Sequence, residues 1–181
     1  MKYDDIPKLL GPTGMATSLG LDYVEECLDQ WNREDRYGVD LDPDFQRGHV
    51  WSDYQRTKYM EFVLRGGVST PIMFNSPAWR GNRRTSSWTL PDTIVIVDGK
   101  QRLTACRMFL RDEVTVFGGK KLSDFDDPKT VVRRTDITYM MNNLTTRKEL
   151  LQWYLEMNEG HIAHTQDELN RIRQLLLDEM K

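Results

Sequence analysis

The segment from residue 93 to residue 110 constrains the fold of this chain more than any other. Thr93-Ile94-Val95-Ile96-Val97 is an apolar run of β-branched residues, which predicts a buried strand. The run from Leu103 to Leu110 has a helical pattern and follows closely. The five residues between them, Asp98-Gly99-Lys100-Gln101-Arg102, are therefore expected to form a tight turn that continues into the first turn of the helix.

The turn at 98–102 has the composition of an anion-binding site. Gly99 lets the backbone turn sharply and lets a ligand approach it closely. The first backbone N–H groups of a helix lack partners and lie at the positive end of its dipole, so they attract phosphate. Lys100 and Arg102 are cations that oppose this dipole, and a bound anion would offset both. The alternative is an ordinary Asp-Gly turn in which Asp98 only caps the helix.

The composition narrows the class of protein. The chain has 181 residues, of which 39% are hydrophobic and 29% are charged, and this suits one domain with a modest core. Its net charge of −3 argues against a protein that coats DNA through general electrostatics, although it is compatible with a local basic patch. No apolar run has the length of a membrane helix, and the N-terminus does not resemble a signal peptide, so a cytoplasmic protein without a membrane partner is expected. Cys27 and Cys106 give neither a disulfide framework nor a zinc spacing, so no structural metal is expected.

The first half of the chain alternates turn-rich and periodic segments. Residues 1–18 hold several prolines and glycines and are expected to form an irregular arm. The patterns then predict a helix at 19–37, a strand at 39–41, a loop at 42–51, and a helix capped by Ser52 that continues to about Arg65.

The second half carries most of the expected strands and ends in helices. Strands are expected at 70–74, 93–97, 114–117 and 136–140, a polar excursion at 76–92, a helix at 99–111, and two C-terminal helices, one at 147–159 and one after a capping box at 165–168. This order predicts an α+β fold with a small mixed sheet. The expected organisation is an N-terminal arm at 1–18, an α/β core at 19–142 with its polar insert at 76–92, and a C-terminal helical pair at 143–181 that packs on the core.

Three blocks of sequence resemble one known family. Pro43-x-Phe45-Gln46-Arg47-x-x-x-Trp51 is similar to P-x-Y-Q-R-x-x-x-W, and Asp98-Gly99-Lys100-Gln101-Arg102-Leu103-Thr104 is similar to D-G-Q-Q-R-L-T. Met157-Asn158-x-Gly160, followed by Thr165-x-x-Glu168-Leu169, is similar to I-N-x-G and L-x-x-x-E-L. These blocks occur in the order found in the ParB/sulfiredoxin-like superfamily, in the D-G-Q-Q-R branch that includes the N-terminal domains of GmrSD-type restriction and phage-defence proteins. Small stand-alone members of this kind resemble copies in phage and mobile-element genomes, which implies a protein of the bacterial cell that either the host or a phage encodes.

The resemblance implies nucleotide binding, and in some members hydrolysis of a nucleoside triphosphate, coupled to DNA transactions or defence. Two departures from the family matter. Lys100 replaces the usual first Gln and adds a charge. The larger relatives carry a C-terminal His-rich nuclease domain, whereas this sequence has only His49, His161 and His164, so nuclease activity of that kind is not expected.

The resemblance and the residue chemistry together suggest roles for particular side chains. Candidate phosphate ligands are Gln46, Arg47, Gly99, Lys100, Arg102 and Asn158. Asp98 is a candidate ligand for Mg²⁺ and, with Gln101, a candidate for positioning an attacking water. Phe45 and Trp51 either stack on a base or anchor the core. The basic side chains of Arg80, Arg83 and Arg84 either contact nucleic acid or a partner protein, or are simply solvated.

These residues support three hypotheses. The first is a nucleotide-binding domain that, if it is an enzyme, hydrolyses a nucleoside triphosphate with Mg²⁺. The second is a non-catalytic module of the phage-inhibitor type, which uses the same fold to bind DNA or a host or phage defence protein. The third is a ParB-like nuclease, which the acidic composition disfavours. The two terminal helices are also compatible with a dimer.

Overall fold

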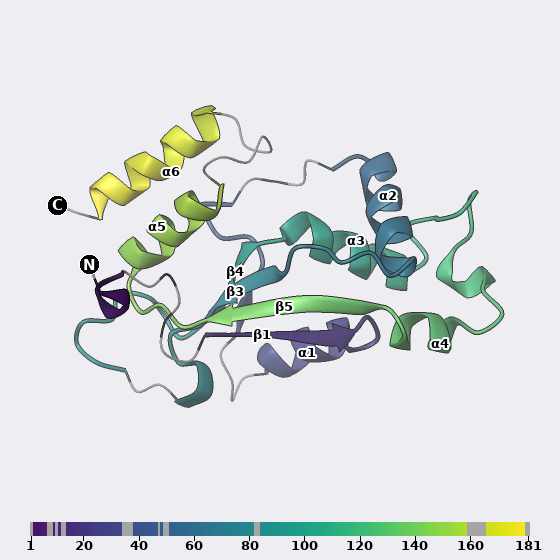
Figure 1. Ribbon diagram of the computed structural model, residues 1–181, viewed down its shortest axis with the longest axis horizontal. Helices are drawn as coiled ribbons and strands as arrows, with labels where there is room; N and C mark the ends of the chain where they lie inside the picture. Colours follow the sequence, from purple (N-terminus) through teal and green to yellow (C-terminus); the bar gives the residue numbers. More distant parts are fainter. Residues whose placement is uncertain are drawn as a thin grey trace.

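A computed structural model describes residues 2–6, 9, 11, 14–33, 38–46, 48, 51–81, 84–158 and 166–179. Within them, one mixed sheet has the strand order β1-β5-β3-β4-β2 (Figure 1). The strands are β1 (Met15–Gly20), β2 (Val39–Asp40), β3 (Ile72–Asn75), β4 (Ile94–Asp98) and β5 (Asp136–Asn142). β1 pairs antiparallel with β5, β5 parallel with β3, β3 antiparallel with β4, and β4 parallel with β2.

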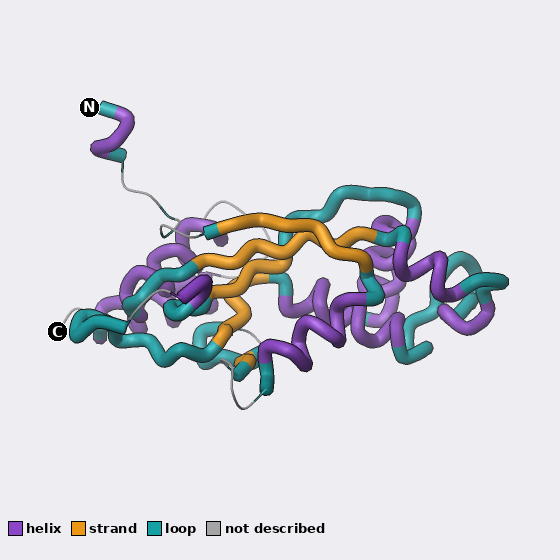
Figure 2. Tube along the Cα trace, turned by 90° about the horizontal axis from the view of Figure 1, so that it is seen from below, coloured by secondary structure: helices purple, strands orange, loops and turns teal. Residues whose placement is uncertain are grey.

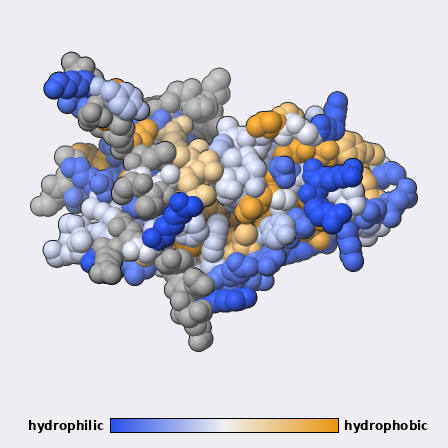
Figure 3. All heavy atoms as spheres, turned by 60° about the horizontal axis from the view of Figure 1, so that its bottom comes forward, coloured by the Kyte–Doolittle hydropathy of each residue, from blue (hydrophilic) through white to orange (hydrophobic). Residues whose placement is uncertain are grey.

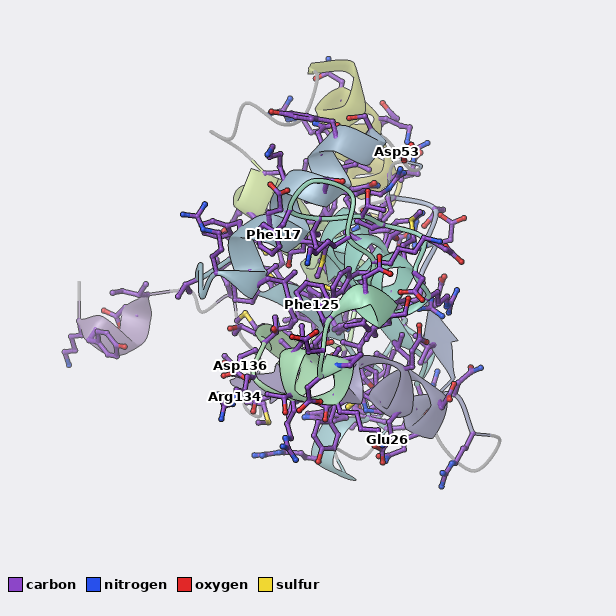
Figure 4. The ribbon with its side chains drawn as sticks, turned by 90° about the vertical axis from the view of Figure 1, so that its right-hand side faces the viewer. Glu26, Asp53, Phe117, Phe125, Arg134 and Asp136 are labelled. Carbon is purple, nitrogen blue, oxygen red and sulfur yellow. The ribbon has the colours of Figure 1, made fainter. Side chains whose placement is uncertain are left out.

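Helices cover both faces of this sheet, as expected for an α+β fold. They are α1 (Tyr23–Trp31), α2 (Asp53–Leu64), α3 (Lys100–Leu110), α4 (Pro128–Arg133), α5 (Arg147–Asn158) and α6 (Gln166–Asp178), with short 3-10 turns η1 (Tyr3–Asp5), η2 (Trp79–Gly81) and η3 (Leu122–Asp124). α5 and α6 lie side by side near one end of the molecule, and α4 lies at the other (Figure 1). η1 stands apart from the sheet in both the tube view and the end-on view (Figures 2 and 4).

Two hydrophobic cores form, one on each face of the sheet. Alternation along β4 separates them, because Ile94 and Ile96 belong to the core under α1, α2 and α3, whereas Val97 belongs to the core under α5 and α6. In the second core Leu150, Leu151 and Trp153 of α5 are almost fully buried. No helix within the described residues has the length and apolar character needed to cross a membrane.

The N-terminal prediction was partly wrong. The irregular arm was expected to continue to residue 18 and a helix to begin at residue 19, but β1 occupies Met15–Gly20 and α1 begins only at Tyr23. Met15, Thr17 and Leu19 alternate along an edge strand that pairs with β5, and such a short period-2 pattern is hard to separate from loop by sequence alone. The expected C-terminal part of this helix, residues 34–37, lies outside the described residues.

A second correction concerns the expected strand at 114–117. These residues form a turn in which Val116 and Lys120 make only an isolated bridge, and the backbone is left-handed at Phe117 with φ 46°. Val114 and Val116 are nevertheless buried in the first core, so burial rather than strand pairing explains their apolar character. α4 was not predicted. It follows Asp127, whose side chain accepts a hydrogen bond from the Thr130 N–H at 3.0 Å.

Other local predictions are confirmed. Ser52 caps α2 and forms a capping box with Gln55, and the helix ends before Gly66, whose φ is 81°. Asp53 is the first residue of α2 and lies at the surface. It lies at the end of the molecule that faces the viewer in Figure 4, as do Phe117 and Phe125.

Candidate functional site

The turn between β4 and α3 has the geometry that its sequence suggests. Asp98 ends β4, Gly99 adopts a left-handed backbone with φ 92°, and α3 begins at Lys100. A Cβ atom at residue 99 would lie 3.0 Å from the Ile72 Cα and 3.1 Å from the Arg102 Nη2. The position therefore requires glycine for both its backbone angle and its close contacts. The turn brings the first N–H groups of α3 to the carboxyl end of β4.

Arg102 is fastened to the turn that precedes it. Its Nη2 donates to the Asp98 Oδ2 at 2.7 Å and to the Pro71 carbonyl at 3.1 Å. The side chain is 17% exposed, and its Nε atom is buried without a hydrogen-bond partner among the described residues. A buried donor of this kind favours the arrival of an acceptor. A magnesium ion held by Asp98 would share that carboxylate with Arg102.

Lys100 forms an ion pair that the sequence analysis missed. Its Nζ donates to the Asp42 Oδ1, which lies at the start of the loop at 42–51. The Lys100 side chain is only 8% exposed, whereas the Asp42 side chain is 83% exposed. The available signal was the position of Asp42 directly before Pro43, at the start of the first family-like block.

The side-chain amide of Gln101 bonds to the backbone of the same loop, the one at 42–51. Its Nε2 donates to the Gly48 carbonyl at 3.0 Å, and its Oε1 accepts from the Trp51 N–H at 3.3 Å. The side chain is buried, with 8% of the residue exposed. These contacts make Gln101 a link between α3 and the loop.

The loop residues of the first family-like block are also attached to the sheet. Gln46 donates from its Nε2 to the Val97 carbonyl, one residue before Asp98. Phe45 is 3% exposed and packs edge-on against Tyr154 of α5, with ring centroids 5.4 Å apart, so its ring belongs to the second core. Arg47 lies outside the described residues, but Gln46 and Gly48 on either side of it both bond to the β4–α3 unit.

The remaining candidates lie apart from the turn or face the core. Trp51 is half-buried against Tyr59, with ring centroids 5.4 Å apart. Asn158 is buried, and its Nδ2 donates to the Tyr154 carbonyl one helical turn earlier at 2.7 Å, as in a side chain that closes its own helix. The block that follows it, from Gly160 to Thr165, lies outside the described residues.

The basic group in the insert is only partly described. Arg80 is exposed in a left-handed conformation with φ 57°, and the Arg84 Nη1 pairs with the Asp92 Oδ1 at 3.1 Å. Arg83 lies outside the described residues. Trp79, which directly precedes Arg80, packs against Trp31 at a centroid distance of 6.2 Å.

Two of the cavities that described residues border lie outside the turn at 98–102, and neither is lined by a residue of that turn. One, of about 150 Å³, lies beside the loop and α5 and is bordered by Pro43, Phe45, Asn75 and Arg147 among others. The other, of about 190 Å³, lies between the sheet and α1 and is walled by Trp31, Phe74, Trp79 and Tyr139. Apolar side chains reach the surface in the middle of the face that carries β1 and α1 (Figure 3). Among the described residues, no group of three His, Cys, Asp or Glu side chains could hold a metal ion.

Comparison with known proteins gives one family. A family model described as the N-terminal domain of the GmrSD restriction endonuclease matches residues 25–180. The match spans the loop at 42–51, the β4–α3 turn and the C-terminal helices. Neither a curated protein nor a solved structure matches the chain.

Proposed function

The chain belongs to the GmrSD restriction endonuclease N-terminal domain family, and from this premise we propose that its β4–α3 turn binds the phosphates of a nucleoside triphosphate. The match makes the chain a module related to restriction and phage defence. The same proposal has three further parts: that the chain descends from the ParB/sulfiredoxin-like superfamily, that it lies in the D-G-Q-Q-R branch, and that it uses nucleotide in a DNA transaction.

The observation that carries the proposal is the left-handed Gly99 at the start of α3. This turn presents the first N–H groups of the helix at the carboxyl end of β4, and a helix N-terminus is a common place for a phosphate to bind. Arg102 and Lys100 supply guanidinium and ammonium donors beside it. The Arg102 Nε, buried without a partner among the described residues, offers a further donor.

The surrounding contacts suggest how the other candidates would act. Gln46 and Gly48 both bond to the β4–α3 unit, so this part of the loop lies beside the turn, and Arg47 remains a phosphate ligand proposed from sequence. Asp98 would share its carboxylate between Arg102 and a Mg²⁺ ion that arrives with the nucleotide. If hydrolysis follows, Mg²⁺ would supply charge stabilisation for the phosphates, and Asp98 and Gln101 of the turn would orient water.

The test is a thermal-shift titration with ATP, GTP, CTP and UTP, each with and without Mg²⁺, on the wild type and on Arg102→Ala. A ligand that binds only the folded state adds about 2.7 kcal/mol of stability at a hundredfold excess over its Kd. We expect one nucleotide to stabilise the wild type and to lose this effect in the variant. Arg111→Ala is the matched control, because Arg111 follows the same helix and pairs with Glu25 instead. A wild type that no nucleotide stabilises would refute the proposal.

A second function is favoured by a different observation. Both cations of the turn already have carboxylate partners, and α2 and the loop after it expose Tyr54, Phe62 and Val68 to 69%, 49% and 88%. A non-catalytic module would use such an apolar surface to bind a host or phage defence protein, or DNA through Arg80, Arg83 and Arg84. In that case Arg102→Ala would leave partner binding unchanged.

A further inference from the structure

The ion pair of Lys100 with Asp42 is unusual in how unevenly its two members are buried. The Lys100 side chain is 8% exposed and is fixed in the first turn of α3, whereas Asp42 is 83% exposed. Moving the Lys100 ammonium would mean repacking a side chain that is almost fully buried at the start of α3. The Asp42 carboxylate lies mostly in water, so exchanging its contact with Lys100 leaves the core unchanged. Of the two partners, Asp42 is therefore the one that can be exchanged.

The electrostatic position of Lys100 explains why an anion is needed there. A cation in the first turn of a helix opposes the positive end of the helix dipole. Asp42 offsets this by placing a carboxylate at the Lys100 Nζ. A phosphate oxygen would serve the same purpose, but a carboxylate and a polyphosphate at the same ammonium would repel each other.

We propose that Asp42 is an internal competitor for the phosphate site: it neutralises Lys100 when no nucleotide is bound, and an arriving phosphate displaces it. This inference rests on the proposed function and adds to it a residue that sets the affinity. Asp42 is a positioning residue here, since it acts through Lys100.

The attachments of the loop limit what this exchange would move. Asp44 is fixed by an ion pair with Arg147 at 2.6 Å, and Gln46 is fixed to the Val97 carbonyl. Asp42 precedes both, and its own N–H donates to the Asp40 Oδ1 at 2.9 Å. Displacement would thus require rotation of the Asp42 side chain, while the loop around Arg47 keeps its attachments.

The experiment measures Kd for the stabilising nucleotide, and for inorganic triphosphate as a probe without a base, by calorimetric titration. Asp42→Asn removes the competing charge and keeps the shape of the side chain. We expect it to bind about fivefold more tightly than the wild type, a factor set by the upper range for exposed ion pairs. Asp92→Asn is the matched control, because Asp92 is an exposed carboxylate paired with Arg84, and its loss changes the net charge equally. Its Kd should stay within about twofold of the wild type, as expected for a surface charge outside the site.

A double-mutant cycle separates competition at Lys100 from a general charge effect. Lys100→Gln keeps hydrogen-bonding reach but removes the ammonium, so adding Asp42→Asn to it should change Kd by less than about twofold. Thermal unfolding of each variant shows whether it is folded. Equal or weaker binding by Asp42→Asn, when the wild type does bind, would overturn this inference and leave the proposed function intact. Absence of binding by the wild type would overturn the proposed function and, with it, this inference.

Discussion

At the scale of single residues, Gly99 has two separate requirements that mutation can distinguish. Its φ of 92° disfavours any residue with a Cβ, and that Cβ would lie 3.0 Å from the Ile72 Cα. We expect Gly99→Ala to lower the free energy of unfolding by about 2–3 kcal/mol, from the left-handed backbone together with the displaced neighbours. Urea denaturation monitored by tryptophan fluorescence measures this loss.

Gly66→Ala is the control for the backbone contribution. Gly66 has a similar φ of 81°, but a Cβ there meets nothing within 4 Å. Its substitution should cost only about 1 kcal/mol, the ordinary penalty for a left-handed residue. If both variants lose the same free energy of unfolding, the close approach of Ile72 to the turn does not affect the stability of the Gly99→Ala variant.

The residues of the turn show what local sequence can and cannot predict about a site. The need for glycine at position 99 follows from the strand, the turn and the helix that are contiguous in sequence. The partners of Lys100 and Gln101 come from the loop at 42–51, between 50 and 58 positions earlier in the chain. No local pattern predicts such pairs, because they depend on how the loop folds back over α3.

At the scale of elements, α1 is joined to α3 by a small charged network. The Glu25 Oε1 accepts hydrogen bonds from the Arg107 Nε at 2.8 Å and from the Arg111 Nη2 at 2.9 Å. Burial alone would raise the pKa of Glu25, but the hydrogen bond and charge of Arg107 and the charge of Arg111 outweigh it, so the pKa lies below its ordinary value. The charged form of Glu25 therefore stabilises the native state.

Glu25→Gln should remove about 1 kcal/mol of stability at neutral pH, the scale of a partly exposed ion-pair network. Because the folded pKa is depressed, the contribution of Glu25 is present above its unfolded pKa, near the ordinary value of 4.5, and is lost as pH falls through the folded value. The wild type and the variant should thus converge in stability as the pH falls below about 4.5, measured by thermal unfolding at several pH values. Glu26→Gln is the control, since the Glu26 Oε1 accepts a hydrogen bond from the Gln30 Nε2 of its own helix at 3.0 Å. A difference between wild type and Glu25→Gln that is constant with pH would contradict this account.

Element boundaries were predictable where the capping chemistry is local. α2 begins after Ser52 and its capping box, as its sequence predicts. β1 was not predictable, because what makes Met15–Gly20 a strand is pairing with β5 about 120 residues later. At 114–117 the error is the opposite, because a strand was predicted where none forms. The apolar side chains of Val114 and Val116 are buried by packing, and Val116 makes only an isolated bridge with Lys120.

At the scale of the whole molecule, the fold class follows from the alternation of helices and strands, but the strand order does not. β3 lies between β5 and β4, and β1 reaches the edge of the sheet only through its pairing with β5. These are long-range choices among topologies that share one order of elements. The result is a sheet that divides two cores, and consecutive residues of β4, Ile96 and Val97, belong to different cores.

Since one strand contributes to both cores, neither core can melt without removing the support of the other. We expect a single calorimetric transition, and a core variant on either face should lower its midpoint without splitting it. Leu151→Ala, at a side chain with 0% exposure in the core under α5 and α6, should cost about 2–5 kcal/mol. Leu177→Ala is the control, because Leu177 is 54% exposed and its truncation should change stability by less than about 0.5 kcal/mol. A separate low-temperature transition in Leu151→Ala would contradict this expectation, because α5 and α6 would then unfold independently of the sheet. It would also mean that the contact between Phe45 and Tyr154 does not couple α5 to the loop at 42–51.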